Sequence, residues 1–160
     1  MTVDAKGLPR TRAATALTEL VLEVFRLNGA LLAAGDRLVA PLGLSSARWQ
    51  VLGAIALAQR PEPVANLARN MGLTRQAVQR IVNDLADGRF VTLEPNPHHR
   101  RAQLVVLTAA GRKLYEGADQ RQVPWVNALA TGLKQAELRA ATQTLHTVRR
   151  RLRQAKGQGG

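Results

Sequence analysis

The chain has 160 residues, 46% of them hydrophobic, which is enough to bury a core but too few for two large domains. Lys and Arg outnumber Asp and Glu by 23 to 11, so the formal net charge is +12 and a polyanion is the expected partner. The lack of cysteine excludes disulfides, thiolate metal sites and thiol-based redox sensing.

The first predicted element is an amphipathic helix over about residues 11–40 that ends near Pro41. Its apolar side chains recur at spacings of three and four residues: Leu17, Leu20, Val21, Val24, Leu27 and Leu31. A second helix is predicted from Ser45 or Ser46, whose hydroxyl caps it, to the prolines at 61 and 63. We expect its buried stripe to consist of Trp49, Leu52, Ile55 and Ala56.

The segment from Val64 to Phe90 is typical of a helix-turn-helix. A short helix ends at Met71, Gly72 allows a tight turn, and Thr74 caps a longer second helix. Winding that helix at ~100° per residue gathers Val78, Ile81, Val82 and Leu85 on one arc. The opposite arc carries Gln76, Gln79, Arg80 and Asn83.

This polar arc has the chemistry of base recognition in duplex DNA. Arg pairs with the O6 and N7 atoms of guanine, and Gln and Asn match the N6 and N7 atoms of adenine. Arg75 begins the helix, where it reaches a base edge or a phosphate, whereas Asp84 and Asp87 are expected at the far end, where the duplex recedes. The other interpretation, a merely solvated polar face, is weaker because of the preceding turn and the net charge.

Two short segments rich in β-branched residues follow, and we interpret them as a hairpin. They flank the sequence NPHHRR, so His99, Arg100 and Arg101 lie at its tip, as in the wing of a winged helix. A guanidinium at such a tip enters a narrow minor groove, although a wing tip is also simply a soluble turn.

The remaining chain is predicted to be helical. One helix runs from Thr108 to about Thr131 with a bend at Pro124, and a last helix runs from about 135 to 154. Leu138, Ala141, Leu145, Val148 and Leu152 form a seam on the last helix that suits a partner helix. Residues 155–160 are expected to be a disordered tail. The predicted fold class is all-α with a small β-hairpin, in a single domain over 1–160.

In its order of motifs, the chain resembles the multiple-antibiotic-resistance regulators, the MarR family. The resemblance rests on LSSARWQVL, on the helix-turn-helix and on NPHHRRAQLVVLTAAGRKL, which together span about residues 44–114. It implies a winged helix-turn-helix over about 44–108, with helices over about 11–40 and 109–154 that interlock two copies into a homodimer. It also implies binding to a palindromic operator, often with release by a small aromatic or lipophilic effector.

By that similarity the DNA-binding residues are Thr74, Arg75, Gln76, Gln79, Arg80, Asn83, His99, Arg100 and Arg101. One departure concerns the wing, because His99 stands where the family usually has an Asp before the arginine pair. We therefore expect backbone carbonyls or neutral His99 to hold Arg101, and we expect protonation of His99 to change DNA affinity.

Other features of the chain suit different functions less well. Trp49 and Trp125 are candidate effector contacts, but a buried Trp more often belongs to a core. His98, His99 and His146 lack suitably spaced carboxylates, so we expect no metal site, and no cofactor or catalytic motif is evident. The arginines of the last helix are more simply a solvated face than a membrane-binding site.

No window of about 18–20 residues is free of charge, and the first residues do not form a signal peptide, so a cytoplasmic location without membrane contact is expected. The main alternative function is a nonspecific architectural nucleic-acid-binding protein with the same winged fold. A small-molecule-binding protein that has lost DNA binding is a third hypothesis, and the intact Arg and Gln face argues against it.

Overall fold

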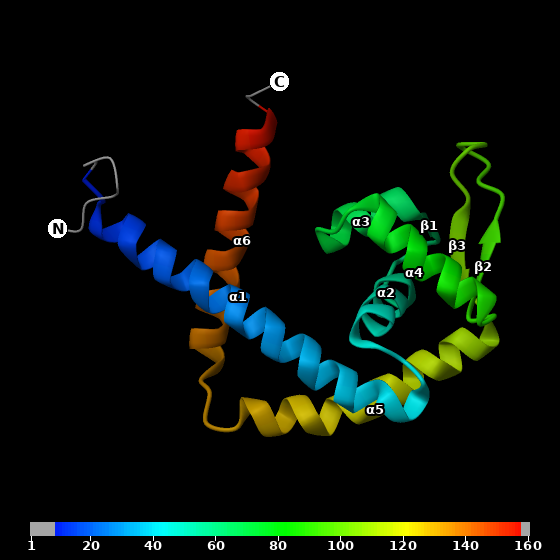
Figure 1. Cartoon of the computed structure of the whole chain (residues 1–160), viewed down its shortest axis with the longest axis horizontal. Helices are drawn as coiled ribbons and strands as arrows, with labels where there is room; N and C mark the ends of the chain where they lie inside the picture. The colour runs from blue at the N-terminus through cyan, green and yellow to red at the C-terminus, as the bar shows by residue number, and fades with distance from the viewer. Residues whose placement is uncertain (1–8, 158–160) are drawn as a thin grey trace. The chain divides into compact units, whose positions relative to one another are not determined.

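The computed structural model describes residues 9–157 and consists mainly of helices (Figure 1). The chain divides into two compact units, Met1–Gln122 and Val123–Gly160, and the boundary lies within helix α5. The helices are α1 (Arg12–Val39), α2 (Ser46–Ala56), α3 (Val64–Met71), α4 (Arg75–Asp87), α5 (Ala109–Ala130) and α6 (Gln135–Gly157). A short 3-10 helix, η1 (Ala40–Leu42), follows α1. The predicted all-α class is confirmed.

Helix α1 is capped by Thr11, whose hydroxyl accepts a hydrogen bond from the Ala14 amide at 3.1 Å. Its last turns pack on the start of α2. The Asp36 carboxylate accepts the Ser46 amide at 2.6 Å, and Gly35 lies so close to the Ser46 hydroxyl that a Cβ at this position would be 2.7 Å from it. This contact fixes the direction in which the chain enters the rest of the first unit.

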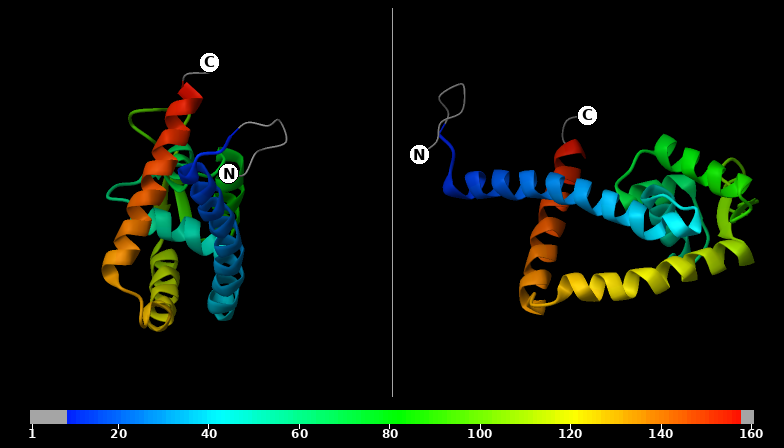
Figure 2. Two further views of the ribbon diagram at one scale, coloured as in Figure 1. Left: turned by 90° about the vertical axis from the view of Figure 1, so that its left-hand side faces the viewer. Right: turned by 60° about the horizontal axis from the view of Figure 1, so that its bottom comes forward.

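Helix α2 is capped by Ser45, the first of the two predicted serines, which accepts the Arg48 amide at 3.3 Å. Its core side chains are Val51, Leu52 and Ile55. The expected stripe was partly wrong, because Trp49 and Ala56 are half-buried whereas Val51, which was not expected, is fully buried. The views in Figure 2 agree that α2, α3 and α4 form one compact body.

The wing contains one more strand than the predicted hairpin. Strands β2 (Val91–Glu94) and β3 (Leu104–Leu107) are antiparallel, with Val91 opposite Leu107 and Glu94 opposite Leu104. The additional strand, β1 (Glu62–Pro63), pairs with the other edge of β3, with Glu62 opposite Val105. The sheet order is therefore β1-β3-β2.

One hydrophobic core joins these elements of the first unit. It contains Val39, Leu52, Leu67, Val78, Val82, Leu85, Val91, Val105 and Ala118, all buried, with further apolar side chains packed around them. Aliphatic side chains dominate, as the low aromatic content predicts. This core supports α4 from one side only.

The C-terminal helices differ slightly from the predicted bounds. Pro124 lies inside α5, and α6 continues to Gly157, three residues into the segment that was expected to be disordered. The rest of that predicted tail, 158–160, lies outside the described residues. None of the helices described here is both long and apolar enough to cross a bilayer.

Candidate nucleic-acid interface

The turn before α4 determines where that helix begins. Gly72 adopts a left-handed backbone conformation with φ of 71°, which costs a glycine little and other residues more. Two residues later, the Thr74 hydroxyl accepts the Ala77 amide at 3.2 Å and caps the helix. Both features of the predicted helix-turn-helix are confirmed.

The apolar arc of α4 anchors the helix in the core. Val78 and Val82 have no exposed surface, Leu85 has 1%, and Ile81 is half-buried against them. The predicted arc therefore faces inward. Because side chains project all round the axis of an α-helix, burial of one arc leaves the opposite arc of α4 facing outward.

The opposite arc forms a continuous polar surface, which we call the polar face of α4. Arg75, Gln76, Arg80 and Asn83 are exposed, and Gln79 is half-buried. The Gln79 amide donates a hydrogen bond to the Asn83 carbonyl oxygen at 3.0 Å, so these two side chains hold each other. All five predicted residues line one open depression on the surface.

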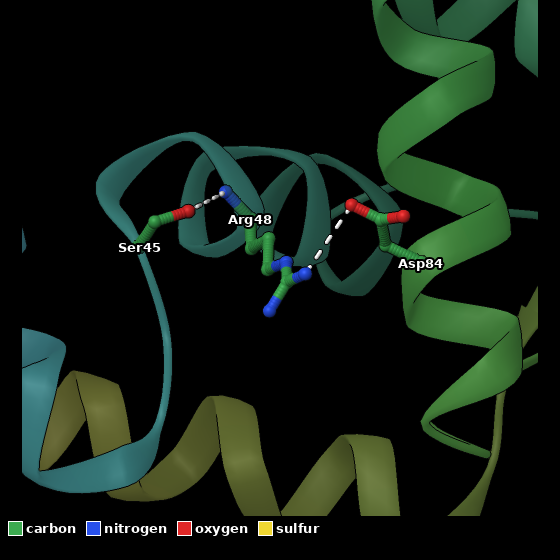
Figure 3. Close-up of polar contacts among 3 residues, drawn as sticks. All are labelled: Ser45, Arg48 and Asp84. Carbon is green, nitrogen blue, oxygen red and sulfur yellow. Dashed lines mark hydrogen bonds and ion pairs between the residues drawn. The ribbon is translucent and has the colours of Figure 1, made fainter.

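The polar face borders an ion pair that sequence reasoning missed. Arg48 on α2 donates from Nη2 to the Asp84 carboxylate on α4 at 3.3 Å, and each side chain is 43% exposed (Figure 3). Among residues 9–157, the guanidinium groups of Arg75 and Arg80 have no such partner. The sequence signal for the ion pair was Asp84 itself, an anion beside an otherwise polar or basic face.

The wing tip is held by hydrogen bonds to Asn96. The amide of His98 donates to the Asn96 side chain at 3.0 Å, and the amide of His99 donates to the Asn96 carbonyl at 3.2 Å. The Ala102 amide then donates to the His99 carbonyl at 3.0 Å. Asn96 was not singled out in the sequence, although Asn is a common residue in such turns.

The predicted wing residues His99, Arg100 and Arg101 are exposed together at this tip. The expectation that His99 or backbone carbonyls hold Arg101 was wrong for the part of the chain that is described, where the Arg101 guanidinium has no hydrogen bond or ion pair. The hydrogen bonds to Asn96 order the turn backbone next to the exposed Arg101 side chain.

The base of the wing is joined to α5 through Thr108. Its hydroxyl donates toward the carbonyls of Arg89 and Phe90, at 2.8 and 3.1 Å, and accepts the Gly111 amide at 3.0 Å. The wing therefore starts from a fixed point in the first unit.

The two candidate effector contacts, Trp49 and Trp125, lie in different units of the chain. Trp49 is half-buried on α2 in the first unit, where its ring packs beside Gly35. Trp125 is half-buried on α5 in the second unit. Among residues 9–157, no three His, Asp or Glu side chains cluster as a metal site would require.

These features define the class of the protein as a winged helix-turn-helix. A sequence profile described as the MarR family matches residues 42–102, which contain the helix-turn-helix and most of the wing. The chain is 37% identical over 129 residues to Rv2011c, an uncharacterized protein of Mycobacterium tuberculosis, with coverage of 81% of this chain and 89% of the relative. It is 28% identical over 109 residues to the transcriptional activatory protein BadR of Rhodopseudomonas palustris, with coverage of 65% and 61%.

Solved structures share the fold over most of the chain. A mutant MarR from E. coli, crystallised with operator DNA, is 25% identical and superposes with a TM-score of 0.65 over 80% of this chain and 94% of that one. CouR from Rhodococcus jostii RHA1, bound to p-coumaroyl-CoA, is 23% identical with a TM-score of 0.71, over 78% of this chain and 87% of that one. The chain belongs to the MarR family of winged-helix transcription regulators.

Proposed function

We propose that this protein is a sequence-specific regulator that binds a palindromic operator in double-stranded DNA as a homodimer. The observation that carries the proposal is the polar face of α4, which is exposed and partly basic while the other side of the helix is buried in the core. A surface of this kind suits insertion into a major groove.

Within this proposal each residue of the polar face has a chemical role. Arg75 and Arg80 donate to guanine O6 and N7 or to phosphates, and Gln76 reads adenine. The hydrogen bond between Gln79 and Asn83 orients their remaining amide groups before DNA arrives. Thr74 contributes by fixing the first turn, whose free amides favour a phosphate.

The wing is proposed to follow the neighbouring minor groove. Arg100 and Arg101 extend from an ordered turn, and a guanidinium is drawn to the negative potential of a narrow minor groove. His99 is adjacent to them in the sequence and is proposed to contact the DNA backbone beside that groove.

Exposed apolar side chains support the proposed homodimer. In one chain, α1 exposes Leu17, Leu27 and Leu31, and α6 exposes Leu138, Leu145 and Leu152. Regularly spaced large apolar residues on a helix surface mark a contact with another protein surface. A second copy would cover them and would supply the twofold symmetry that a palindromic operator requires.

Repression and ligand release complete the proposal. A dimer bound at a promoter blocks polymerase, and a small aromatic or lipophilic ligand releases it. The bound p-coumaroyl-CoA of CouR supports such an effector, with Trp49 and Trp125 as candidate contacts. Transcription from the operator-bearing promoter, measured with and without the protein, distinguishes repression from activation. The proposed cytoplasmic location follows from the location of bacterial operator DNA.

The test begins with selection of bound fragments from genomic DNA of the source organism, followed by titration of a selected fragment and a scrambled copy at several salt concentrations. We expect the selected fragment to bind at least about 10³-fold more tightly. An architectural protein would instead bind both sequences alike and lose affinity on both in parallel as salt rises. That result would favour the alternative function, a nonspecific architectural nucleic-acid-binding protein, over the proposed one.

A further inference from the structure

The ion pair between α2 and α4 lies beside an arginine of the proposed DNA-reading surface. Asp84 follows Arg80 by four residues, so their side chains leave the same side of α4 about one turn apart. An Arg and an Asp at this spacing are within reach of each other on a helix surface, although the order with the acidic residue first is the more favourable one. In the described structure, however, the Asp84 carboxylate contacts Arg48 on α2, and Arg80 remains without an ion pair among residues 9–157.

Arg48 is placed for this contact by the start of α2. The Ser45 hydroxyl accepts the Arg48 amide at 3.3 Å, and the side chain extends from that turn toward α4, as Figure 3 shows. The Ser46 amide is bound by Asp36 at 2.6 Å, which fixes the same turn to α1. The position of the Arg48 backbone is therefore set by two caps before its guanidinium reaches Asp84.

We infer that Arg48 is a positioning residue for DNA recognition: it engages the Asp84 carboxylate and so leaves the Arg80 guanidinium available to a base. The positive charge of Arg48 also offsets the negative charge of the Asp84 carboxylate and so reduces the repulsion between this carboxylate and the phosphates of the duplex. This inference rests on the proposed function, because it assumes that the polar face of α4 contacts DNA.

The inference predicts coupling among three side chains. In an Arg48→Met variant, Asp84 loses its partner on α2 and pairs with Arg80 along the helix. We expect operator affinity to fall about twofold to fivefold, the range that one exposed ion pair supports. Replacing Asp84 with Asn should restore affinity in the Arg48→Met background and change it much less in the wild type. Arg80→Gln should cost less affinity in Arg48→Met than in the wild type, because Arg80 is already engaged there.

The measurement is a set of titrations of the selected operator with wild type, Arg48→Met, Asp84→Asn and the double variant, and with Arg80→Gln alone and combined with Arg48→Met. Lys134→Met is the control. Lys134 also belongs to an ion pair, with Glu137 at 3.6 Å, so its replacement removes one paired cation that belongs to the second unit. Equal effects of Asp84→Asn in both backgrounds would overturn the inference, because independent charges act additively whereas a pair does not.

A second measurement needs no DNA and so separates this inference from the proposed function. The NMR signal of the Arg80 Nε–H group, assigned by its loss in Arg80→Gln, is compared among the same variants. We expect it to shift in Arg48→Met and to return in the double variant. A signal that stays unchanged would refute the inference even if the operator is bound, whereas a shift without operator preference would leave the ion-pair exchange intact and reject the proposed function.

Discussion

Arg80 is the residue whose replacement tests base recognition most simply. It is exposed on α4, and a bidentate contact between Arg and guanine favours the correct base. Arg80→Ala is predicted to weaken operator binding by about 1–3 kcal/mol and to relax specificity at one base-pair position. Titration against operators substituted at single positions measures both effects. Arg37→Ala, which removes an exposed arginine in the last turn of α1, serves as the control. An equal loss on operator and scrambled DNA would assign Arg80 to a phosphate instead.

Gly111 lies where α5 passes close to the backbone just before the wing. A Cβ at this position would overlap the Phe90 carbonyl oxygen, which also accepts a hydrogen bond from Thr108. Gly111→Ala is predicted to lower the free energy of unfolding by about 1–3 kcal/mol, as measured by denaturant unfolding. Gly53→Ala on α2 is the matched control, because its Cβ would meet Tyr115 at an ordinary 3.6 Å. That substitution should raise stability by about 0.5–1 kcal/mol through helix propensity, and similar effects of the two substitutions would contradict the packing described here.

At the scale of elements, the cap at Thr74 determines where the reading helix starts. Thr74→Ala removes the acceptor for the Ala77 amide and is predicted to cost about 1 kcal/mol of stability. Thr74→Ser keeps the hydroxyl and should retain most of the wild-type stability, so the comparison isolates the hydrogen bond. Unfolding curves of the two variants provide the check, and equal losses would show that the methyl group rather than the cap stabilises this turn.

The elements that the sequence predicts well are those governed by local chemistry. The 3.6-residue period of α4 shows which residues face the core, and Gly72 with Thr74 marks the turn, because these signals act within a few residues. The two-residue strand β1 was missed because Pro63 indicates the end of an element, and its pairing with Val105 depends on tertiary packing. The Arg48–Asp84 pair was missed for the same reason, since its partners are 36 residues apart in the chain.

The wing was predicted correctly as an element, but the group that orders its tip was not. Its position and its basic tip are predictable from two β-branched segments around NPHHRR. The group that orders the tip is not predictable from the sequence, because Asn96, His99 and the backbone all offer acceptors within a few residues. In the structure Asn96 accepts the hydrogen bonds that order the tip, and this depends on the exact turn conformation rather than on composition.

At the scale of the whole molecule, the exposed apolar residues on α1 and α6 predict that a single chain is not the working unit. Leu27 is 52% exposed and Leu145 is 41% exposed. The double replacement Leu27→Glu with Leu145→Glu is predicted to convert the dimer to a monomer at micromolar concentrations, because two charges on each chain would have to be buried. Sedimentation velocity measures this change. The monomer should also lose most operator affinity, and a wild type that already sediments as a monomer would contradict the dimer proposal.

In the proposed complex, two copies of the polar face of α4 read one duplex. Methylation interference at guanine N7 on the selected operator tests it most directly, since this atom faces the major groove and is the acceptor for Arg. We expect two clusters of interfering guanines on one face of the DNA, with centres about 10–10.5 base pairs apart. Both clusters should weaken in Arg80→Ala. Binding that methylation of major-groove guanines leaves unchanged, or a single isolated cluster, would contradict the claim.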